Sequence, residues 1–135
     1  MKRLAAMGLV CLLSACQSSP ETYLSGQPAK AANFPAMAAD LSDCVSRFSQ
    51  SMLSAYWFHR IPVREDKEFL VIAKGSNAPT QPKYPQLELR FISQGQTTQV
   101  ELRNTHIGDH ELEDQVWSIV GRCAQQMTKP SALGQ

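Results

Sequence analysis

The sequence predicts an α+β fold, a two-layer sandwich in which an antiparallel sheet of three to four strands carries two disulfide-linked helices on one face. Apolar residues recur at helical spacing near both ends of the chain, whereas the middle alternates apolar and charged residues with the period of a strand. One cysteine lies in each helical segment. The expected order of elements is therefore α-β-β-β-β-α.

Length and composition restrict the class of protein. The chain has 135 residues, of which 43% are hydrophobic and 19% charged, and its formal net charge is +1. This length fits one domain, and the apolar fraction is too high for a chain disordered throughout. A charge so near zero argues against nucleic-acid binding, which requires clustered Lys and Arg.

The N-terminus carries a motif of its own. Lys2 and Arg3 precede an apolar stretch of about ten residues, too short to cross a bilayer but typical of a secretory signal. It ends in Leu13-Ser14-Ala15-Cys16, which resembles the lipobox of bacterial (Gram-negative) lipoproteins. An ordinary cleaved signal, or a buried helix with a chance cysteine, is the alternative.

The resemblance implies cleavage before Cys16 and a covalent lipid on that residue, with no other cofactor. In this family an Asp after the cysteine retains the protein in the inner membrane. Gln17 departs from that signal, so the resemblance implies the outer membrane, facing the periplasm. The expected organisation is a signal peptide over 1–15, a lipidated flexible tether over 16–35, a globular periplasmic domain over 36–130 and a tail over 131–135.

A helix opens the expected domain. An apolar stripe at helical spacing predicts its buried face, with polar residues such as Ser42 and Ser49 on the solvated face; the stripe comprises Met37, Leu41, Cys44, Val45, Phe48, Met52 and Tyr56. Two short strands follow, Trp57 to Val63 and Phe69 to Ala73. Pro62 marks the first as an edge strand or an irregular connection. The continuous apolar run of the second predicts a central strand that is covered on at least part of both faces.

The clearest local prediction is a hairpin over 86–105. Pairing Phe91 with Val100 also sets Arg90 opposite Glu101 and Glu88 opposite Arg103, whereas a slip by two residues sets like charges against each other. The charged residues are expected on a solvated outer face.

A second helix is expected from about residue 110 to 128, with Asp109 as its N-cap. Cys44 and Cys123 each lie on the apolar face of a predicted helix. Because Cys11 leaves with the signal and Cys16 is lipidated, these two remain and are expected to form a disulfide in an oxidising compartment.

Two segments are candidates for partner binding. Tyr56-Trp57-Phe58-His59-Arg60 is the only aromatic cluster, and Trp, Tyr and Arg are typical interface anchors. Alternatively, its aromatic residues belong to the core. Pro79, Pro82 and Pro85 share one face of a polyproline II turn, which aromatic grooves bind; a stiff surface connection is the alternative.

Motifs of catalysis are missing from the sequence. It contains no Gly-x-Ser-x-Gly, phosphate loop or His-Glu-x-x-His, and His106, Asp109 and His110 at a helix start make a poor metal site. We therefore expect a non-catalytic outer-membrane lipoprotein, an accessory or assembly factor that binds a protein partner in a secretion, conjugation or cell-wall complex. The alternatives are a periplasmic inhibitor or immunity protein acting on a toxin or lysozyme-like hydrolase, with the loop at 64–68 or 75–86 as its plug, or capture of a lipid or small ligand between sheet and helices.

Overall fold

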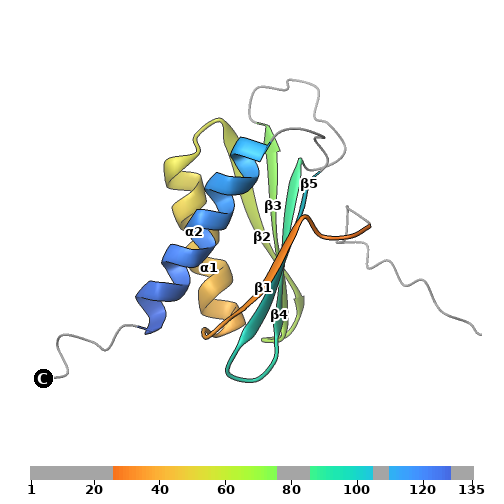
Figure 1. Ribbon diagram of the computed structural model, residues 1–135, viewed down its shortest axis with the longest axis vertical. Helices are drawn as coiled ribbons and strands as arrows, with labels where there is room; N and C mark the ends of the chain where they lie inside the picture. The colour runs from red at the N-terminus through yellow and green to blue at the C-terminus, as the bar shows by residue number, and fades with distance from the viewer. Residues whose placement is uncertain (1–25, 76–85, 105–109, 129–135) are drawn as a thin grey trace, which may run out of the picture.

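The computed structural model describes residues 26–75, 86–104 and 110–128 and shows an α+β sandwich (Figure 1). A single antiparallel sheet with strand order β1-β5-β4-β3-β2 forms one layer, and two helices pack on one of its faces. The elements are β1 (Lys30–Phe34), α1 (Ala38–Met52), β2 (Tyr56–Arg64), β3 (Glu68–Gly75), β4 (Leu87–Ser93), β5 (Thr98–Asn104) and α2 (His110–Thr128).

The expected count of three to four strands was wrong, because the sheet has five. The additional strand is β1, which lies within the segment 16–35 that was expected to be a flexible tether. It pairs with β5 from Lys30 opposite Leu102 to Phe34 opposite Thr98. The order of elements is thus β-α-β-β-β-β-α. Ala31, Ala32 and Asn33 are all exposed. Because none of them is buried, the sequence lacks the alternation of apolar and polar residues that would predict this strand.

The predicted hairpin is confirmed in its register. Phe91 pairs with Val100, Arg90 with Glu101 and Glu88 with Arg103 across β4 and β5. A turn with Gly95 at φ 91° joins the strands, and it is closed by a bond from Gln94 N–H to the Thr97 carbonyl at 2.8 Å. A positive φ of this kind favours glycine.

The core lies between the sheet and the two helices. Its centre is formed by side chains that are fully buried, among them Leu41, Val45, Leu89, Phe91, Val100, Leu102, Val116 and Val120. Protein interiors are normally close-packed, which leaves little room for a guest molecule between the layers. The packing therefore favours a structural role for this interior.

The buried face of α1 is rotated relative to the predicted stripe. Ser42 and Ser49, expected on the solvated face, are fully buried, whereas Met37 and Met52 are more than half exposed. The helix ends at Met52, and Tyr56 instead opens β2. Ser42 is satisfied by accepting a hydrogen bond from Arg60 Nε at 2.9 Å and donating one to the Ala39 carbonyl at 3.1 Å. Such polar partners let a serine occupy an interior position.

The sheet face opposite the helices is less solvated than expected. β3 is internal and buried on both faces, as predicted, because Leu70 and Ile72 are buried on this outer face. Glu88, expected in solvent, is fully buried as well. Arg90 forms an ion pair with Glu68 on β3 at 3.4 Å, and both side chains are less than a quarter exposed. The prediction of a solvent-exposed outer face of the sheet was therefore wrong.

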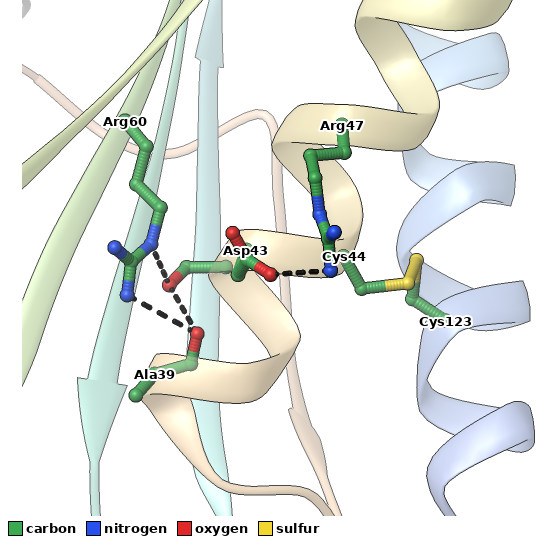
Figure 2. Close-up of polar contacts among 7 residues, drawn as sticks. Ala39, Asp43, Cys44, Arg47, Arg60 and Cys123 are labelled. Atoms are coloured by element: carbon green, nitrogen blue, oxygen red, sulfur yellow. Dashed lines mark hydrogen bonds and ion pairs between the residues drawn. A yellow bond between two sulfur atoms is a disulfide. The ribbon is translucent and has the colours of Figure 1, made fainter.

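The expected disulfide joins the two helices (Figure 2). Cys44 of α1 and Cys123 of α2 are bonded, with their Cα atoms 6.0 Å apart and a separation of 79 positions in the sequence. Cys123 is buried and Cys44 half-buried beside Phe48. Among the described residues, no helix is long and apolar enough to cross a membrane.

Candidate functional site

The aromatic cluster at 56–60 forms the first half of β2, which is an outer strand of the sheet. Successive side chains of a strand point to opposite faces. The strand therefore divides the cluster into two groups with different roles.

Tyr56, Phe58 and Arg60 belong to the helix-facing group and are structural. Phe58 is 7% exposed, and Tyr56 packs edge-on against it with ring centroids 6.4 Å apart. The Arg60 guanidinium lies 4.3 Å from the centre of the Phe69 ring. It also donates to Ser42 Oγ and, at 3.2 Å, to the Ala39 carbonyl of α1 (Figure 2). Arg60 thus fixes α1 on the sheet.

Trp57 and His59 point to the outer face and are exposed. Trp57, at 56% exposure, is the most exposed of the large hydrophobic side chains described. It lies opposite Lys74 in the β2–β3 ladder. Trp57, His59 and Lys74 line a small hollow of about 170 Å³ together with Gly75. We call Trp57, His59 and Lys74 the Trp57 patch.

The Trp57 patch combines an apolar surface with positive charge. An exposed Trp offers a large contact area, and Lys74 favours an acidic or polar partner group. Lys74 was not predicted as part of a site, because only the register of β2 against β3 places it beside Trp57. The Trp57 patch thus contains two of the five residues predicted as a binding cluster, Trp57 and His59, together with Lys74.

The free edge of β2 itself is blocked. The Gln50 side chain of α1 accepts a hydrogen bond from Phe58 N–H at 2.9 Å and donates one to the Tyr56 carbonyl at 3.0 Å. Pro62 has no N–H to offer, and the ladder is irregular between Pro62 and Arg64. Such devices prevent a further strand from adding to an edge. Docking at β2 would therefore use side chains rather than strand addition.

A second surface feature lies where the end of α1 meets α2. Two adjoining hollows of about 350 and 360 Å³ share Met52, Leu53 and Gln115. Met52 is 54% exposed, and the rim carries Glu111, Asp114 and Arg122. Charges of both signs on this rim select no particular ligand.

Several predicted residues lie outside the described part of the chain. These are the lipidation residue Cys16, the prolines Pro79, Pro82 and Pro85, and the pair His106 and Asp109.

Of the residues considered for a metal site, only His110 lies in the described part of the chain. Its Nδ1 lies 3.3 Å from a carboxylate oxygen of Glu113, one helical turn along α2. The described residues hold no group of three or more His, Cys, Asp or Glu side chains that could bind a metal ion.

The loop at 64–68, considered as an inhibitory plug, is a tight turn between β2 and β3. Lys67 N–H donates to the Arg64 carbonyl at 3.1 Å, and Asp66 adopts a φ of 57°. Arg64 and Glu68 form an ion pair at 3.7 Å across its base. A turn this short projects little beyond the sheet.

The chain matches no protein-family model, no curated protein and no solved structure.

Proposed function

We propose that the protein is a non-catalytic lipoprotein of the outer membrane that faces the periplasm and binds a protein partner in an envelope complex. The secretion, conjugation and cell-wall machineries are the candidate complexes. Cys16, following Leu13-Ser14-Ala15, is the proposed attachment point of the lipid. Several acyl chains on one residue would hold the protein at the membrane, because each buried CH₂ contributes about 0.8 kcal/mol.

The Trp57 patch is the observation that carries the binding role. Most large apolar side chains of the described fold are buried between its layers, whereas Trp57 remains more than half exposed beside Lys74. It lies on a rigid strand whose neighbouring residues Phe58 and Arg60 are fixed by the core and by α1. Side chains held by a rigid element lose little conformational entropy on binding.

In-cell photo-crosslinking tests the proposal. A photo-reactive phenylalanine analogue replaces Trp57, which keeps an aromatic side chain at that position. We expect it to capture one subunit of an envelope complex, identified by mass spectrometry. The Lys74→Glu substitution should reduce the capture at least about tenfold, corresponding to about 1.4 kcal/mol of binding free energy.

The matched control carries the same analogue at Gln125, an exposed position on α2 away from β2, and should capture far less of that subunit. Equal capture from Trp57 and Gln125, or none from either, would contradict the proposal. Capture of a secreted hydrolase or toxin would replace the assembly role with that of an inhibitor.

A further inference from the structure

The two outer strands of the sheet differ in whether their free edges are blocked against pairing with a further strand. β2 is blocked by the Gln50 side chain, by Pro62 and by the irregular ladder beside it. β1 lies at the opposite edge (Figure 1). The five residues of β1 include no proline, and the three central ones are exposed. An open edge offers unpaired backbone groups to another strand.

The hydrogen-bond pattern shows which groups of β1 point outward. Gln94 N–H bonds to the Thr97 carbonyl where β4 and β5 join. Because bonding alternates along an antiparallel ladder, Thr98, Val100 and Leu102 direct their backbone groups to β1. Their partners in the register are Phe34, Ala32 and Lys30. The N–H and C=O groups of Ala31 and Asn33 therefore face away from the sheet.

We propose that β1 is a dimerisation edge that pairs in antiparallel fashion with β1 of a second copy of this chain. A two-fold axis between the two Ala32 residues sets Ala31 opposite Asn33 of the second copy. This register joins the outward-facing backbone groups of both strands, and it overlaps all five residues of β1. A slip by one residue would set outward-facing groups against inward-facing ones.

The side chains of β1 are compatible with pairing to β1 of a second copy. The register sets Lys30 opposite Phe34, so no like charges oppose each other, and only alanine methyl groups meet at the axis. On the helix side, Phe34 packs edge-on against Trp117 of α2 with ring centroids 5.7 Å apart. Both rings are only partly buried. Lys30 keeps its ion pair with Asp114 of its own α2 at 3.4 Å, so only the apolar stem of Lys30 from the second copy would lie beside these rings. Pro35 follows β1 directly and limits the ladder to its five residues.

Cysteine crosslinking of the full chain tests this register. In the proposed dimer the two Ala32 residues form a pair without mutual hydrogen bonds, with Cα atoms about 4.5 Å apart, within reach of a disulfide. Whole cells expressing Ala32→Cys are oxidised, and their total protein is run on a non-reducing gel. We expect a reducible dimer as the main species.

Ala31→Cys is the matched control. In the proposed dimer Ala31 lies opposite Asn33 of the second copy, so the two Ala31 residues are offset by two positions along the strands. It should give at least about tenfold less dimer than Ala32→Cys. The unsubstituted chain is run alongside to account for Cys11 and Cys16. Dimer from Ala32→Cys no more abundant than from Ala31→Cys would overturn the proposal.

A second variant tests association without an added cysteine. Ala31→Pro removes an outward-facing N–H that the isolated subunit does not use, and proline is tolerated at such edge positions. We expect an unchanged circular dichroism spectrum and a shift from dimer to monomer in sedimentation of the detergent-solubilised full chain. A folded Ala31→Pro chain that sediments like the unsubstituted protein would contradict the proposal. Neither readout depends on the lipid anchor or on the Trp57 patch.

Discussion

Replacing Cys44 and Cys123 together by alanine is expected to lower the free energy of unfolding by about 4 kcal/mol. The bond closes a loop of 79 positions, and the chain-entropy model assigns a stabilisation of that order to such a loop. It also joins α2, the last element of the described chain, to α1. Since the total stability of a domain is about 5–15 kcal/mol, this loss is a large fraction of it.

Urea denaturation followed by circular dichroism measures this effect. The double variant should unfold at a midpoint lower by more than about 1 M. Reductant should move the unsubstituted protein to the same midpoint and leave the double variant unchanged. A loss below about 1 kcal/mol would show that the two helices pack stably without the bond.

Phe91→Ala is expected to lower the free energy of unfolding by about 3–5 kcal/mol, since it removes a large side chain and leaves a cavity. Phe91 is fully buried on β4, the middle strand of the sheet. It lies between Phe69 on β3 and Val100 on β5, so the rigid ladder on both sides limits collapse around the cavity.

Trp57→Ala is the matched control for this experiment. It also truncates an aromatic side chain on a strand, but at a position that is 56% exposed. The change in unfolding free energy should stay within about 0.5 kcal/mol. A loss for Trp57→Ala comparable to that for Phe91→Ala would assign Trp57 to the core and remove it from the proposed binding surface.

The hairpin was predictable because two independent signals agree there. Apolar residues alternate along both strands, and only one register pairs Arg90 with Glu101 and Glu88 with Arg103. β1 offers neither signal. Its three central residues are exposed on an outer strand, so its pairing with β5 depends on backbone bonds that leave no pattern in the sequence.

The rotation of α1 was missed for a related reason. Hydrophobicity alone places Ser42 and Ser49 on the solvated face, yet both are fully buried. Ser42 is compatible with the interior because it hydrogen-bonds to Arg60, which lies 18 positions away on β2. A partner so distant in the sequence cannot be inferred from helical spacing.

The candidate site was predictable only in part. The sequence identified the aromatic cluster, but the β conformation determines which members are accessible, and it sends Phe58 into the core and Trp57 to the surface. Lys74 joins Trp57 through the pairing of β2 with β3. Charge and aromatic content indicate a binding segment, whereas register decides its composition.

Intact mass spectrometry of the protein purified from membranes tests most directly whether the chain is a lipid-anchored protein of the envelope. We expect a chain that begins at Cys16 and carries the mass of a diacylglycerol and an additional acyl group. Cys16→Ser should lose that mass and leave the membrane fraction. An unmodified Cys16, or an unprocessed chain beginning at Met1, would contradict the proposed lipid anchor.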